Sequence, residues 1–189
     1  MIRRRRMLQA TSAAALLPTA LEAGEAELDP VPPLPVRPTA GKAGDFDFLA
    51  GRWRIDHWRR PAGASEWDRF KGEATCWTIL AGVGSVEELR IPERGFSGMG
   101  LRLLDLKQHV WSDFWVNAKS GVLTAPGQTG SFENGVGLFV SDFDDAGKPM
   151  KSAGIWDRIT PDACRWRQVV SADGGKTWTH DWIMHWRRV

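Results

Sequence analysis

Five polar residues on different predicted strands carry the chemistry that this sequence offers: His57, Glu88, Arg102, Asn117 and His180. Alternation of apolar and polar residues places each of them on the inward face of its strand, if the strands close into a barrel. Inward side chains from different strands converge on one lumen. An imidazole near a guanidinium suits proton transfer and the stabilisation of an enolate or phenolate oxygen. The sequence therefore predicts a lumenal site.

The charged candidates also have a purely structural interpretation. Glu87 and Glu88 fall on opposite faces of one predicted strand, so one of them must point inward, and Glu88 is the candidate. Glu88 and Arg102 can form an internal ion pair, with His57 bonded to a backbone carbonyl, because buried charges persist only when they are paired. The sequence leaves both interpretations open.

Tryptophan is the second chemical signal, since the chain has eleven Trp and no Tyr. Large rings with one polar edge line ligand cavities or fill the ends of small barrels, and most of these should be core. Trp115 and Trp182 are predicted to contact a ligand, because each shares its strand face with a polar lumen candidate.

Other chemistries have little support. The sequence contains no nucleophile elbow, no phosphate-binding glycine loop and no H-E-x-x-H. His180 and His185 are an odd number of residues apart and face opposite sides of a strand, so no metal site is predicted. Cys76 and Cys164 lie in strand-like runs and are expected to be buried thiols, with a disulfide as the alternative.

Residues 45–60 organise the predicted fold. Phe46, Phe48 and Leu49 are spaced for a short helical turn, the pattern breaks at Gly51, and strict alternation follows through His57. This order predicts a helical plug followed by the first strand of a barrel, with His57 facing the lumen.

The rest of the chain predicts an all-β fold, a single antiparallel up-and-down β-barrel of eight to ten strands. Its first strand (Arg52–Arg60) and its last (Thr177–Arg188) should pair antiparallel and close the barrel. On the last strand one face is expected to carry Trp178, His180, Trp182, Met184, Trp186 and Arg188. Just before it, Ser171–Trp178 matches the S-x-D-x-G-x-T-W Asp-box, which predicts a tight hairpin.

The N-terminal residues predict export. Arg3–Arg6 precede the mildly apolar run Ala10–Leu21, and the spacing fits a twin-arginine signal peptide covering residues 1–26. Residues 27–44 contain five of the eleven prolines and predict an extended linker, so the barrel domain comprises residues 45–189. The expected location is periplasmic or secreted.

Removal of the leader changes the charge. Four of the 25 Lys and Arg residues and two of the 23 Asp and Glu residues lie in residues 1–26, which leaves 21 of each sign. A neutral domain has no field that would favour nucleic acid or an anionic membrane, so neither is an expected partner.

Several segments together resemble a bacterial family of lipocalin-like (calycin) barrels of unknown function: Phe46–Trp53, Leu101–Leu103, Trp111–Trp115, Gly130–Gly137 and Ser171–Trp182. The resemblance covers most of residues 45–188 and implies the architecture. Positions Asp181 and His185 depart from it, since the family usually has an amide and an acidic residue there. Nitrobindins, which are similar barrels, hold haem through a histidine near the C-terminus, and His180 is the corresponding candidate.

Three functional hypotheses follow. The first is an exported protein that binds a small apolar or aromatic molecule between Trp115 and Trp182, oriented by His57, Glu88 and Arg102, without a cofactor. The second is a cofactor-free lyase, isomerase or hydrolase, in which His57 is the general acid or base, Arg102 stabilises an oxyanion and Glu88 completes the lumenal set. The third is a haem-binding protein of the nitrobindin type.

Overall fold

The computed structural model describes Val31, residues 40–61 and residues 63–189 of the chain. The predicted signal peptide and most of the predicted linker lie outside the described residues. Within the described part, no helix has the length and apolar character needed to cross a membrane.

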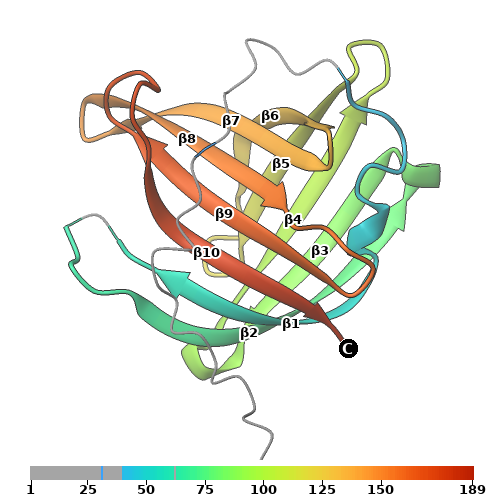
Figure 1. Ribbon diagram of the computed structural model, residues 1–189, viewed down its shortest axis with the longest axis horizontal. Helices are drawn as coiled ribbons and strands as arrows, with labels where there is room; N and C mark the ends of the chain where they lie inside the picture. The colour runs from blue at the N-terminus through green and yellow to red at the C-terminus, as the bar shows by residue number, and fades with distance from the viewer. Residues whose placement is uncertain (1–30, 32–39, 62) are drawn as a thin grey trace, which may run out of the picture. The chain divides into compact units, whose positions relative to one another are not determined.

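Ten antiparallel strands form one closed barrel, in which each strand pairs with its neighbours along the chain (Figure 1). The strands are β1 (Gly51–Arg59), β2 (Asp68–Ile79), β3 (Gly84–Ile91), β4 (Phe96–Asp105), β5 (Val110–Asn117), β6 (Leu123–Glu133), β7 (Val136–Asp145), β8 (Lys148–Asp157), β9 (Ala163–Ser171) and β10 (Thr179–Arg188). The described residues also form three 3-10 turns, η2 (Asp47–Leu49), η3 (Leu80–Gly82) and η4 (Pro92–Arg94). The predicted all-β, up-and-down barrel is confirmed.

The barrel closes between its first and last strands, as predicted. β1 and β10 pair antiparallel, with Trp53 opposite Arg188, Ile55 opposite Trp186 and His57 opposite Met184. Because this pairing satisfies the hydrogen-bonding edges of both strands, the described barrel has no free edge.

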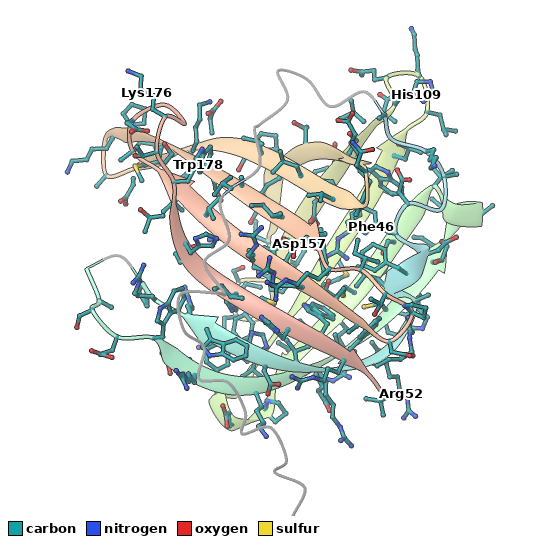
Figure 2. The ribbon with its side chains drawn as sticks, in the orientation of Figure 1. Phe46, Arg52, His109, Asp157, Lys176 and Trp178 are labelled. Carbon is teal, nitrogen blue, oxygen red and sulfur yellow. The ribbon has the colours of Figure 1, made fainter. Side chains whose placement is uncertain are left out.

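The predicted plug fills one end of the barrel. Phe46 and Leu49, beside and within η2, are buried, and the Leu49 carbonyl accepts a hydrogen bond of 2.7 Å from Trp53 Nε1. The Phe46 ring, labelled in Figure 2, meets the rings of Trp111 and Phe132 edge-on, with centroids 5.0 Å away in both cases. These contacts make the plug part of the main core.

That core also contains Cys76 and Cys164, which are free, buried thiols as expected. Burial raises the pKa of both thiols, which keeps them protonated.

The Asp-box hairpin joins β9 to β10. Asp173 Oδ1 accepts hydrogen bonds of 2.9 Å from the backbone N–H groups of Lys176 and Thr177, and Trp178 Nε1 donates to the Gly175 carbonyl at 3.1 Å. Lys176 and Trp178 lie together on this hairpin in Figure 2, away from Phe46. The predicted turn is confirmed, at the end of the barrel opposite the plug.

A second apolar cluster lies on the outer face of β7, β8 and β9. Leu138, Ala153, Ile155 and Val169 are buried there, and Val31 packs against them. This side of the barrel is therefore buried on both faces.

Candidate functional site

A cavity of about 500 Å³ occupies the barrel between the plug and the open end. Side chains from β3 to β10 line it, and five of them are tryptophans: Trp115, Trp156, Trp166, Trp182 and Trp186. Apolar walls with a few polar groups are typical of small-molecule sites, and the volume falls within their usual range of about 300 to 1,000 Å³. Trp115 and Trp182 line the cavity, as the sequence predicted.

The deep end of the cavity, next to the plug, holds one guanidinium and two carboxylates. Arg102 Nη2 donates to Glu87 Oε2 at 2.6 Å, and Arg102 Nε lies 3.4 Å from Asp113 Oδ1. The guanidinium carbon is 5.1 Å from the centroid of the Phe46 ring and 5.4 Å from that of Trp156. Arg102 thus faces the lumen as predicted, fixed by the plug and by neighbouring strands.

Burial governs the protonation of this cluster. Burial alone would lower the pKa of Arg102, but the charges of Asp113 and Glu87 outweigh it and raise that pKa. Burial, together with the charge of Glu87, raises the pKa of Asp113 despite the opposing effect of Arg102. The guanidinium therefore stays charged, and Asp113 takes up a proton more readily than an exposed aspartate.

Four buried donors at this end have no hydrogen-bond partner among the described residues: Arg102 Nε, which faces Asp113 at 3.4 Å, Arg102 Nη1, Trp156 Nε1 and Trp186 Nε1. Their residues line the cavity and are at most 4% exposed. The rings of Trp156 and Trp186 lie 5.5 Å apart, centroid to centroid. Buried donors normally have acceptors, so this group is chemically equipped to receive one from a bound molecule.

Nearer the open end, amide side chains order the polar wall. Gln168 Nε2 donates to Asp181 Oδ2 at 3.0 Å, while Asp181 Oδ1 is buried without a partner in the described structure. Burial raises the pKa of Asp181, although Gln168 and Arg59 oppose this effect. On the neighbouring strands Gln128 Nε2 donates to the hydroxyls of Ser141 and Ser152, both at 3.2 Å.

His57 points inward as predicted but does not line the cavity. Its ring stacks on Phe70 with centroids 4.6 Å apart, and Nδ1 accepts a hydrogen bond of 3.2 Å from Trp182 Nε1. Nε2 faces Gly72, where a β-carbon would come within 2.5 Å of it. Burial and the charge of Arg94, partly opposed by Asp56, lower the pKa of His57 to about 4. A neutral ring sealed by two aromatic side chains is a structural element of the wall.

The prediction that Glu88 faces the lumen is wrong. The Glu88 side chain is 52% exposed and pairs with Arg90 at 2.8 Å, whereas Glu87 is the inward carboxylate. The reason is strand parity, since Glu87 shares its face with the buried residues Leu89 and Ile91.

The lumen prediction for His180 is also wrong. The pairing of β9 with β10 shifts between His180 and Trp182, so that His180 opposes Val169 while Trp182 opposes Gln168. Val169 belongs to the outer cluster and Gln168 lines the cavity. The extra residue, Asp181, forms a β-bulge that turns His180 to the outer face, where its Nε2 meets Arg167 Nη1 at 3.0 Å.

Asn117 has the predicted parity but a local role. Its Oδ1 accepts a hydrogen bond of 2.9 Å from the backbone N–H of Lys119 in the turn after β5. Because the strand ends at Asn117, the side chain orders that turn and is not among the residues that line the cavity.

Among the polar residues that line the cavity, only Arg102 had been predicted, and those missed include Glu87, Asp113, Gln168 and Asp181. The sequence did contain a signal for two of them. Glu87 lies two residues before the apolar Leu89, and Asp113 two residues before Trp115, so each shares the inward face of its strand. No pattern marks a bulge in advance, so Asp181 had no such signal.

The cavity does not fit a haem held by histidine. His180 lies on the outer face, and none of the described cavity-lining residues is a histidine. Within the same described ranges, no three His, Cys, Asp or Glu side chains gather closely enough to hold a metal ion.

The His57-based catalytic hypothesis also lacks its geometry, because the imidazole does not reach the cavity that contains Arg102. With Glu88 on the outer surface, Glu87 takes the place that hypothesis gave to Glu88. What the cavity offers chemically is recognition, through flat apolar walls and a few fixed donors and acceptors.

No family model matches the chain, and no curated protein does. Among solved structures, the chain is similar to the S-type phycobiliprotein lyase CPES from Guillardia theta, with 11% identity, a TM-score of 0.49 and coverage of 76% of this chain and 90% of that one. It is also similar to Rv2717c from M. tuberculosis, with 12% identity, a TM-score of 0.48 and coverage of 76% and 94%. A protein of unknown function from the DUF3598 family of Nostoc punctiforme shares 13% identity, with a TM-score of 0.41 and coverage of 82% and 53%. What the structure itself shows is a closed, ten-stranded antiparallel barrel, the architecture that the sequence resemblance implied.

Proposed function

We propose that this protein binds a small apolar or aromatic molecule inside its barrel. The observation that carries the proposal is the cavity of about 500 Å³, which combines five tryptophans with buried donors that have no partner in the described structure. Such donors cost free energy unless an acceptor satisfies them, about 1 to 3 kcal/mol for each group. A bound molecule that accepts these hydrogen bonds removes that cost, and by filling the apolar space it also buries apolar surface of its own.

The proposal includes export. Arg4 and Arg5, followed by an apolar run of signal-peptide length, support a twin-arginine leader, and the neutral charge of the remaining chain favours an uncharged ligand over a nucleic acid. Cell fractionation of the producing organism tests this part, with the expected product shortened by about the length of the leader.

Binding is tested by isothermal titration calorimetry and tryptophan fluorescence with a panel of small aromatic compounds and fatty acids. A cavity-filling variant, Val170→Trp, supplies the specificity test because Val170 lines the lumen. Val122→Trp is the matched control, since Val122 is 66% exposed in the loop after β5.

The proposal expects wild type and Val122→Trp to bind at least one compound and Val170→Trp to lose that binding while remaining folded in a thermal melt. Absence of binding across the panel contradicts the proposal. Equal binding by Val170→Trp also contradicts it, because the bound compound would then lie outside the barrel cavity.

A further inference from the structure

We propose that the ligand is an uncharged, flat, conjugated carbonyl compound with a hydroxyl or N–H group at its opposite end. This inference rests on the proposed function and specifies its ligand class. The carbonyl oxygen lies at the deep end of the cavity, near Arg102, and the donor group lies near Asp181.

The deep end requires an acceptor. Arg102 Nη1, Trp156 Nε1 and Trp186 Nε1 can only donate, and all three lack an acceptor in the described structure. They lie close together, because the Arg102 guanidinium is 5.4 Å from the Trp156 ring and that ring is 5.5 Å from Trp186. A carbonyl oxygen, with two lone pairs, accepts from two of them at once.

The acceptor should carry no charge. Arg102 is already balanced by Glu87 at 2.6 Å and faces a second carboxylate, Asp113, at 3.4 Å. A ligand carboxylate would bring a third acidic group to one guanidinium in a buried site. Burial already raises the pKa of Asp113, so the site disfavours further negative charge.

The other polar end should donate a hydrogen bond. Asp181 Oδ1 is a buried acceptor without a described partner, and Gln168 fixes the second oxygen of the same carboxyl group. Asp181 and Trp186 are five residues apart on β10, which corresponds to roughly 15 Å along a strand. Allowing two hydrogen bonds of about 2.9 Å each, the polar atoms of the ligand should be on the order of 10 Å apart.

The walls require a flat molecule between these ends. Trp166 and Trp182 meet at a centroid distance of 6.1 Å, and Trp156 lies 6.5 Å from Trp166. Aromatic faces and edges at these positions favour a conjugated ring system over a flexible chain, because ring contacts add about 0.5 to 1.5 kcal/mol beyond buried area.

Four naphthalene probes separate these requirements in calorimetry at pH 7. They are 2-ethylnaphthalene, which has no acceptor, 2-naphthoate, which has a charged one, 2-acetonaphthone, which has a neutral one, and 6-hydroxy-2-acetonaphthone, which adds a donor. Each gained hydrogen bond should tighten binding by about 3- to 10-fold, and the naphthoate should bind about 10-fold or more weakly than the ketone.

Substitutions test which residue binds each polar end of the probe. Trp186→Phe keeps an aromatic ring and removes Nε1, so it should weaken binding of both ketones by about 3-fold or more beyond any change in the binding of ethylnaphthalene, which reports the smaller ring alone. Asp181→Asn should remove the advantage of the hydroxylated ketone. The matched controls are Trp77→Phe and Asp142→Asn, because Trp77 is 47% exposed and Asp142 is an exposed partner of Lys151.

The possible results are distinguishable. The ranking hydroxyketone, ketone, ethylnaphthalene, with naphthoate below the ketone, supports the inference if Trp186→Phe and Asp181→Asn change it as described. Naphthoate or ethylnaphthalene binding as tightly as the ketones overturns the inference and leaves the proposed function standing. If none of the four probes binds, and the wider panel of aromatic compounds and fatty acids gives no binding either, both are overturned.

Discussion

Replacing Arg102 by methionine removes the guanidinium of the deep cluster and leaves the Glu87 and Asp113 carboxylates behind. The side chains of Arg102 and Glu87 are only 5% and 4% exposed, so bulk water replaces little of the lost partner. Breaking a buried ion pair by removing one member typically costs about 3 to 5 kcal/mol. We expect Arg102→Met to lower the free energy of unfolding at pH 7 by that amount.

Glu87→Gln should be milder. The amide keeps the shape and one acceptor oxygen of Glu87, and Arg102 retains Asp113 at 3.4 Å. The substitution also removes a negative charge that raises the pKa of Asp113. A loss below about 2 kcal/mol is expected, close to that of a single buried hydrogen bond.

The pH dependence of Arg102→Met follows from the same geometry. Burial raises the pKa of Asp113 in the folded protein, and without the Arg102 guanidinium the main opposing effect on this pKa is gone, so it rises further above the unfolded value. Stability from such groups is fully present below the unfolded pKa and is lost as pH rises through the folded pKa. The deficit relative to wild type should therefore shrink by roughly 1 to 3 kcal/mol between pH 7 and pH 5.

Urea unfolding followed by tryptophan fluorescence at both pH values measures these differences. The reasoning is refuted if Arg102→Met is as stable as wild type at pH 7, or if its deficit grows on acidification. It is also refuted if Glu87→Gln is as damaging as Arg102→Met.

Three further outcomes are expected. The His57 ring should titrate in NMR with a midpoint near the pKa of about 4 that burial and Arg94 produce. Because the pKa of an unfolded histidine is 6.5, the stability that the neutral ring contributes should be lost as pH falls from 6.5 towards 4. A midpoint above 6 would contradict the sealed position of the ring. Gly130→Ala should destabilise the barrel by about 1 to 3 kcal/mol in urea, since its β-carbon would collide with the Leu138 backbone carbonyl, and an unchanged midpoint would argue against that close approach. Cys76 and Cys164 should react with a thiol reagent only in denaturant, and rapid reaction of the native protein would show that they are not buried.

The barrel could be predicted because its signals are local and repeated. Alternation through Trp53, Ile55 and His57 identified the first strand, and the Asp-box identified the last hairpin. Up-and-down topology then leaves β10 as the natural partner of β1, which the structure confirms. The apolar outer face around Ile155 and Val169 did not follow from alternation, because strands buried on both faces lose the period of two.

The site was harder to predict because it depends on one-residue differences. Neighbouring residues on a strand face opposite sides, so Glu87 points into the lumen while Glu88 points to the surface. The bulge at Asp181 adds one residue and so turns the His180 side chain from the inner to the outer face. Parity alone also could not show that the inward ring of His57 would be covered by Phe70 and Trp182. Arg102 was predictable, since a charged residue between Leu101 and Leu103 on a strand points to the opposite face.

The most direct test of ligand binding in the barrel is a crystal structure of the protein soaked with 6-hydroxy-2-acetonaphthone. We predict density for the compound inside the cavity, with its carbonyl oxygen within hydrogen-bond distance of Arg102 Nη1 or a Trp Nε1 and its hydroxyl at Asp181. Density only on the outer surface, or a lumen that holds solvent while the compound binds elsewhere, would contradict the proposed site.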